Sequence, residues 1–135
     1  MVDDNNMGLL ARKAVLEELG FTVTTVATPQ DALQLLSERE FDLVITDYRL
    51  PSMTGSELIK RMRKQEIDTP VILLSGFVEA LGLDESNTGA DVVLQKSAHE
   101  VSHMVRSVRS LLRRGSPRKP NASVKPAAKT RRKTG

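Results

Sequence analysis

Apolar residues recur along this chain at two spacings, one helical and one extended. Between residues 6 and 19 they return every three or four positions, which predicts an amphipathic helix that ends at Gly20. The residues expected to face inward on this helix are Met7, Leu10, Ala11, Ala14, Val15 and Leu19. The same spacing predicts helices over residues 28–36, 55–65 and 97–114, and a shorter one over 78–88 that Gly82 interrupts.

Short runs of β-branched and aliphatic residues separate these helices. They predict strands over residues 21–26, 41–46, 70–75 and 92–95. Because the runs are apolar at consecutive positions, the strands should be covered on both faces, as in a parallel sheet with helices on either side. The fold class that follows is α/β, with a doubly wound sheet.

Polar residues stand just after the predicted strands. They are Asp3 and Asp4 near the start of the chain, then Asp47, Ser75 and Lys96. The carboxyl ends of parallel strands meet at one edge of a sheet, so these side chains are expected to gather there. Carboxylates suit Mg²⁺, and a carboxylate can also attack phosphorus, while an ammonium group and a hydroxyl can offset phosphoryl charge. The set is complete for the chemistry of an acyl phosphate.

The motifs around these positions resemble a known family, the CheY-like receiver domains of two-component response regulators. The resemblance extends from Val2 to about Arg114. It rests on Val2-Asp3-Asp4-Asn5, on residues 44–55 (VITDYRLPSMTG), on Leu73-Leu74-Ser75-Gly76, and on Gly89-Ala90-Asp91 leading to Gln95-Lys96. It implies a flavodoxin-like, five-stranded parallel sheet with strand order 2-1-3-4-5 and helices on both faces.

The resemblance also implies a role for each residue of the cluster. Asp47 is the expected phosphoacceptor. The expected ligands of Mg²⁺ are Asp4, Asp3 through water, Asp47 and the backbone carbonyl of Arg49. Ser75 and Lys96 are expected to contact the phosphoryl oxygens, and Gly76 to leave room for the phosphodonor. No enzyme activity is implied beyond self-phosphorylation and autodephosphorylation.

Three positions depart from the family pattern. Only Met1 and Val2 precede Asp3, so the first strand is expected to be truncated against a common length of about five residues. The usual aromatic switch residue is Val93 here, which shifts the expected signalling route towards Ser75 and its loop. Ser97 replaces the usual proline after the lysine. A cis bond without proline costs about 2.5–4 kcal/mol, so a trans bond is expected, with Ser97 as a helix cap.

The net charge of +3 hides an asymmetry. Residues 115–135 hold seven of the 20 Lys and Arg residues and no acid, which leaves 13 basic and 17 acidic residues in 1–114. We therefore expect a receiver domain over 1–114 and a disordered basic tail over 115–135, because the tail has too little apolar surface to fold. Such a tail permits weak, nonspecific nucleic-acid contact, but no module for sequence-specific DNA binding follows the domain.

The remaining composition narrows the class of protein. The absence of cysteine excludes disulfides and thiolate catalysis. No apolar run reaches the roughly 18 residues that a membrane span requires, so a cytoplasmic location without membrane contact is expected.

The leading hypothesis is a single-domain response regulator. It would accept a phosphoryl group from a histidine kinase or a histidine phosphotransfer protein and signal through phosphorylation-dependent protein interaction. A related alternative is the clipped terminal receiver of a hybrid histidine kinase. A second class is a non-phosphorylated interaction module, which Val93 favours, and a third is a nucleic-acid-associated protein acting through the tail. A hydrolase is disfavoured because Arg49 stands where aspartyl-phosphate phosphatases carry an acid/base carboxylate.

Overall fold

The central sheet has three parallel strands in the order β1-β2-β3. They are β1 (Val44–Asp47), β2 (Val71–Ser75) and β3 (Val92–Gln95). The computed structural model describes residues 1–3, 5–97 and 100–115. In the register, Asp47 lies opposite Leu74 and Ser75 lies opposite Gln95, so the three strands end at one edge of the sheet. This arrangement confirms three of the predicted strands and their parallel direction.

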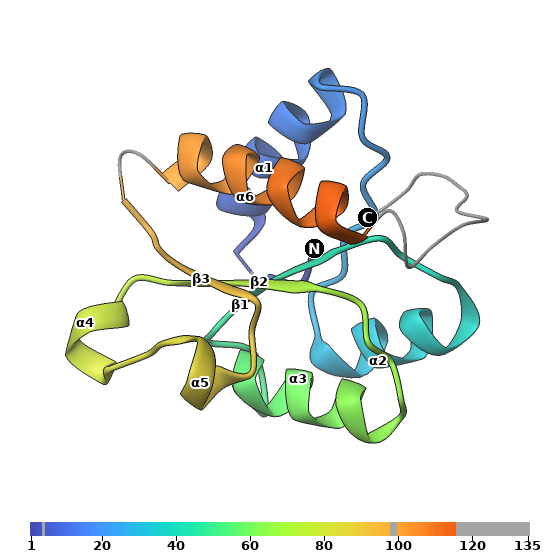
Figure 1. Ribbon diagram of the computed structural model, residues 1–135, viewed down its shortest axis with the longest axis vertical. Coiled ribbons are helices and arrows are strands. Elements are labelled where there is room, and N and C mark those ends of the chain that lie inside the picture. The colour runs from blue at the N-terminus through green and yellow to red at the C-terminus, as the bar shows by residue number, and fades with distance from the viewer. Residues whose placement is uncertain (4, 98–99, 116–135) are drawn as a thin grey trace.

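Helices cover both faces of the sheet (Figure 1). In chain order they are α1 (Asn6–Glu18), α2 (Pro29–Glu38), α3 (Gly55–Lys64), α4 (Val78–Leu81), α5 (Glu85–Thr88) and α6 (Glu100–Gly115). Helices α1 and α6 lie on one face, and α2 and α3 lie on the other (Figure 1). Gly82 ends α4 in the left-handed region with φ of 64°, so the predicted interruption of the 78–88 segment is confirmed. Within the described residues, no helix is long and apolar enough to cross a membrane.

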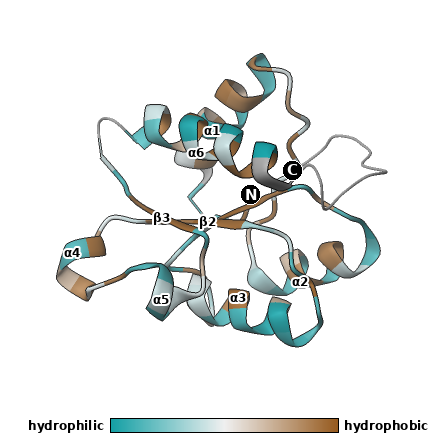
Figure 2. Cartoon of the chain, viewed as in Figure 1, coloured by the Kyte–Doolittle hydropathy of each residue, from teal (hydrophilic) through white to brown (hydrophobic). Residues whose placement is uncertain are grey.

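The strands are apolar at consecutive positions because successive side chains enter different cores. Ile45, Ile72 and Leu74 pack in the cluster under α1 and α6. Val44 and Leu73 point the other way, into the cluster under α2 and α3. Figure 2 shows the hydrophobic strands lying between helices that contain both hydrophobic and hydrophilic residues. Burial on both faces follows from the period of two along a strand.

The predicted strand over residues 21–26 is wrong. In the described chain only Val26 pairs, as an isolated parallel bridge with Val2, and Val2 forms a second bridge with Thr46. A strand needs a partner along its length, and the segment beside residues 21–26 offers only residues 1–3. The truncated first strand is thus reduced to one bridging residue, and the described sheet has three strands rather than five.

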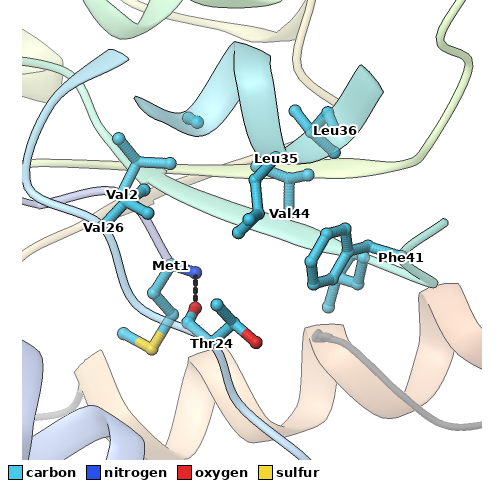
Figure 3. A pocket seen from close by; sticks show the side chains of 10 residues that line it. Met1, Val2, Thr24, Val26, Leu35, Leu36, Phe41 and Val44 are labelled. Atoms are coloured by element: carbon cyan, nitrogen blue, oxygen red, sulfur yellow. Dashed lines mark hydrogen bonds between the residues drawn. The ribbon is translucent and has the colours of Figure 1, made fainter. Parts of the chain in front are cut away.

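The first residue is nevertheless fixed within the structure. The α-ammonium of Met1 donates to the carbonyl of Thr24 at 2.7 Å (Figure 3). The Val26 N–H donates to the Met1 carbonyl at 2.9 Å, and the Asp47 N–H donates to the Val2 carbonyl at 2.9 Å. An apolar pocket between this segment, α2 and β1 is lined by Leu35, Leu36, Phe41 and Val44 among others (Figure 3). These bonds hold Asp3 directly beside the end of β1.

The inward face of α1 differs from the prediction. Leu10 is 60% exposed, whereas Leu9, Arg12 and Leu16 are buried. The prediction chose the wrong helical face, because the apolar residues of this helix lie on several sides and the buried face includes a charged residue, Arg12. Arg12 can be buried here because two carboxylates bind its guanidinium, as described below.

Candidate functional site

Asp47 and Lys96 form an ion pair at the carboxyl edge of the sheet. Asp47 is the last residue of β1 and is only 8% exposed. Lys96 follows β3, and its backbone N–H donates to the Ser75 carbonyl at 2.8 Å. Its Nζ lies 2.8 Å from Oδ1 of Asp47, so the lysine crosses the end of β2 to reach the carboxylate. The structure therefore brings these two predicted site residues together.

The environment of Asp47 disfavours its ionised form. Burial raises the pKa of its carboxyl above the ordinary value, and the negative charge of Asp3 raises it further. The hydrogen bond and charge of Lys96, and the charge of Arg12, act in the opposite direction on this pKa. An ionised Asp47 thus depends on nearby positive charge, and a further cation would stabilise it.

Asp3 is buried beside Asp47 and is held at both carboxylate oxygens. Its Oδ1 accepts from the Asn5 N–H at 2.9 Å. Its Oδ2 accepts from Arg12 at 2.9 Å, and Arg12 also donates through Nε to Glu100 at the start of α6. Sequence reasoning missed both Arg12 and Glu100 as parts of the site. No local signal could have joined them, because 88 positions separate the two residues.

Ser75 and Gly76 form the end of β2 and the start of the next loop. Ser75 is buried, and its Oγ accepts from the Phe77 N–H at 3.0 Å, so its hydroxyl stabilises its own loop. A Cβ built on Gly76 would meet no atom within 4 Å. An alanine at this position would therefore meet no neighbour, and room for a phosphodonor beside Gly76 stays a prediction.

Gln95 ties this loop to β3, a contact that sequence reasoning also missed. Its side-chain oxygen accepts from the Val78 N–H at 3.0 Å, and its side-chain nitrogen donates to the Gly76 carbonyl at 2.6 Å. Gln95 immediately precedes Lys96 in the chain. One strand end thus positions both the lysine of the site and the loop beside it.

Arg49, two residues after Asp47, packs against Phe77, two residues after Ser75. The guanidinium carbon of Arg49 lies 5.2 Å from the centroid of the Phe77 ring, a cation–π distance, and Phe77 is 53% exposed. Val93, the position without an aromatic, is partly buried against the α3 side of the core. Its N–H donates to Glu85 at 3.0 Å. Phe77 is thus an aromatic residue close to the site, although it lies on a different strand connection.

The donors around Asp47 suit Mg²⁺ in kind. Asp3 and Asp47 supply carboxylates close enough for one charge to affect the pKa of the other, and oxygen ligands are those that Mg²⁺ prefers. Asp4, the expected direct ligand, lies outside the described residues. Among the residues that are described, no group of three carboxylates or histidines gathers to hold a metal. The described part of the site therefore provides two acidic side chains, each already paired with a cation.

A parallel α/β fold with a carboxylate and a lysine at its strand ends defines the class of CheY-like receiver domains. The chain belongs to the response regulator receiver domain family, whose model matches residues 1–109. This match confirms the resemblance that the sequence motifs indicated.

Two curated relatives share the matching region. The chain is 34% identical over 100 residues to the aerobic respiration control sensor protein ArcB of Escherichia coli, covering 71% of this chain and 13% of that protein. It is 37% identical over 123 residues to the transcriptional regulatory protein TcrA of Mycobacterium tuberculosis, covering 87% of this chain and 47% of that protein. The chain thus spans less than half of the length of either relative.

Solved structures support the same fold. The receiver domain of the Francisella response regulator 1452 has a TM-score of 0.76 at 30% identity, covering 84% of this chain and 93% of that one. The response regulator TrrA of Thermotoga maritima, solved in complex with Mg²⁺ and BeF, has a TM-score of 0.71 at 28% identity, covering 82% and 94%. Both alignments extend over most of the compared chain.

Proposed function

We propose that this receiver domain accepts a phosphoryl group on Asp47, from a histidine kinase or a histidine phosphotransfer protein, and signals through a change in protein interaction. The observation that carries the proposal is the 2.8 Å contact between the Lys96 ammonium and the buried Asp47 carboxylate. A lysine in this position can stabilise negative charge on the carboxylate before the transfer and on the phosphoryl oxygens after it. The family match to residues 1–109 supports the same assignment.

The proposed reaction is a phosphoryl transfer to a carboxylate. An oxygen of Asp47 attacks phosphorus, the P–N bond of the donor phosphohistidine breaks, and the donor imidazole keeps the electron pair and takes a proton. Asp3, Asp4, Asp47 and the carbonyl of Arg49 are the proposed ligands of Mg²⁺. When bound, Mg²⁺ would neutralise negative charge on the phosphoryl oxygens. Lys96 would contact those oxygens from the opposite strand.

The proposed switch starts at Ser75. In the described state its Oγ accepts from the Phe77 N–H at 3.0 Å. A hydroxyl that turns to donate to a phosphoryl oxygen gives up this role, so the loop after β2 loses one of its bonds. Val93 offers no ring to rotate, and Gln95 is bonded to the same loop. We therefore place the signal in residues 76–78 and β3 rather than in an aromatic side chain.

The proposal includes several features expected from the sequence. They are a receiver domain over 1–114 followed by a basic tail, a cytoplasmic location, and no enzyme activity beyond self-phosphorylation and autodephosphorylation. The bridges Val26–Val2 and Val2–Thr46 support an underlying strand order of 2-1-3-4-5, with two positions reduced to single pairs.

The test is incubation with acetyl phosphate and Mg²⁺, followed by intact-protein mass spectrometry. The expected result is a mass increase of one phosphoryl group, absent in Asp47→Asn and retained in Asp68→Asn, an exposed aspartate. Beryllofluoride with Mg²⁺ should also shift the amide resonances of Asp47 and Ser75. The proposal would be contradicted if the original chain showed no mass increase with acetyl phosphate and no shifts with beryllofluoride.

A further inference from the structure

A buried arginine connects three parts of the fold. Arg12 of α1 is 5% exposed, and its partners Asp3 and Glu100 are 3% and 9% exposed. Its NH1 lies 2.9 Å from Oδ2 of Asp3, and its Nε lies 2.5 Å from Oε2 of Glu100. One guanidinium therefore joins the acidic residue beside Asp47 to the first residue of α6 (Asp3–Arg12–Glu100, hereafter the buried triad).

The geometry of the buried triad is specific to arginine. Two different nitrogens bind two different carboxylates, which a single ammonium on a flexible stem cannot reproduce in the same fixed arrangement. Gly8, one turn earlier in α1, leaves the space that the guanidinium fills. A Cβ at position 8 would lie 3.1 Å from NH1 of Arg12. Glycine therefore stands in the first turn of α1 where the guanidinium passes, although glycine is a poor helix former.

The positive charge of Arg12 affects the pKa of Asp47, the proposed phosphoacceptor. Its charge lowers the pKa of Asp47, against the larger effect of burial and the repulsion from Asp3. Arg12 also occupies Oδ2 of Asp3, so a cation that approaches this carboxylate must share it with the guanidinium or displace it. The charge of Glu100 in turn balances Arg12 from the side away from Asp3.

We propose that Arg12 is a positioning residue that lowers the affinity of the acidic site for Mg²⁺ and conveys metal binding to the start of α6 through Glu100. The inference rests on the Mg²⁺ site of the proposed function, but it does not require phosphorylation. A cation at Asp3 draws the carboxylate away from Arg12, and the guanidinium then changes its contact with Glu100. Glu100 begins α6, so the change reaches that helix directly.

The experiment is a Mg²⁺ titration of the full chain without phosphodonor, followed by amide NMR shifts at Asp47, Ser75, Glu100 and Val101. The double variant Arg12→Leu/Glu100→Leu removes the cation and its balancing charge together. We expect its Kd for Mg²⁺ to fall about fivefold, from the loss of a nearby positive charge in a partly buried site.

The matched control is Lys13→Leu/Glu17→Leu. It removes an ion pair from the same helix, at 2.9 Å, but with side chains 32% and 44% exposed. Its Kd should stay within about twofold of the original value, because exposed pairs contribute little. An equal Kd for the original chain and the Arg12/Glu100 double variant would overturn the effect on affinity. So would an absence of Mg²⁺-dependent shifts in both at saturating metal.

A second variant tests the connection to α6 and guards against poor folding of the first. Arg12→Lys keeps the positive charge, but its single ammonium cannot hold Asp3 and Glu100 in the arrangement that the guanidinium gives. We expect Mg²⁺ to shift Glu100 and Val101 in the original chain, and these shifts to be lost in Arg12→Lys while those at Asp47 remain. Unchanged Glu100 and Val101 on metal binding in the original chain would overturn the relay. Because no phosphodonor is present, failure of Asp47 to accept phosphoryl would leave these results intact, and the reverse also holds.

Discussion

Nζ of Lys96 lies 2.8 Å from Oδ1 of Asp47, although β2 separates the strands that carry the two residues. The contact fixes the lysine where phosphoryl charge would develop. We predict that Lys96→Ala slows phosphorylation of Asp47 by acetyl phosphate about 100-fold, in line with the loss of one preorganised charged donor. The measurement is the rate of phosphoryl incorporation at saturating Mg²⁺.

Lys60→Ala is the control for that measurement, because Lys60 is an exposed lysine of α3. Its phosphorylation rate should equal that of the original chain. Equal rates for Lys96→Ala and the original chain would remove Lys96 from the proposed chemistry.

The raised pKa of Asp47 predicts a pH-dependent stability. Folding favours the protonated carboxyl, so this stabilising contribution is fully present below the ordinary pKa of 3.8 and is lost as pH rises through the higher pKa of the folded state. The substitution Asp47→Asn replaces the carboxyl with an amide that cannot ionise. The free energy of unfolding of this variant therefore does not decrease through ionisation at position 47 as the pH rises. Urea unfolding should therefore show that Asp47→Asn gains stability relative to the original chain between pH 3 and pH 7. A relative loss over that interval would contradict the assigned cause.

The contact between Arg49 and Phe77 leads us to predict that Arg49 lengthens the half-life of phosphorylated Asp47. Their cation–π contact, at 5.2 Å, joins the loop after β1 to the loop after β2. We expect Arg49, two residues after Asp47, to restrict the approach of water to the phosphoryl group. Arg49→Ala should shorten the half-life of phosphorylated protein several-fold, as followed by mass spectrometry after removal of the donor. Arg49→Lys should give an intermediate half-life, because a lysine retains charge but stacks less well on the ring. An unchanged half-life in Arg49→Ala would exclude Arg49 from this role.

Two glycines offer a matched test of packing around the site. A Cβ at Gly55 would lie 2.5 Å from the carbonyl oxygen of Asp47 and 2.7 Å from Cδ1 of Leu73. Gly55→Ala should lower the free energy of unfolding by about 1–3 kcal/mol, because α3 must move away from β1. Gly76→Ala meets nothing within 4 Å and should change it by less than about 0.5 kcal/mol. Chemical denaturation of both variants would show whether this order holds.

Sequence patterns predicted the features that depend on short stretches of chain. The apolar runs of β1, β2 and β3 and the helical spacing of α2 and α3 are local properties and were found correctly. The convergence of Asp47 and Lys96 followed from a rule about parallel strand ends. Residues 21–26 have the composition of a strand but lack a partner of sufficient length, which composition does not reveal.

The missed features are side-chain contacts between distant segments. Burial of Arg12 depends on Glu100, 88 positions away, so a pattern of apolar residues within one helix does not reveal it. Gln95 is similar, because its partners Gly76 and Val78 lie in another connection. Polar residues whose burial is made possible by a tertiary partner are therefore the main limit of prediction for this chain.

The two bonds of Gln95 have a mechanical consequence. One side chain binds both the Gly76 carbonyl and the Val78 N–H, so both hydrogen bonds oppose small displacements of the loop. A displacement of the loop that begins at Ser75 must either break both hydrogen bonds of Gln95 or move the end of β3 together with the loop. We therefore expect the loop to change position in a two-state manner, with both hydrogen bonds made or both broken, and intermediate positions to be sparsely populated.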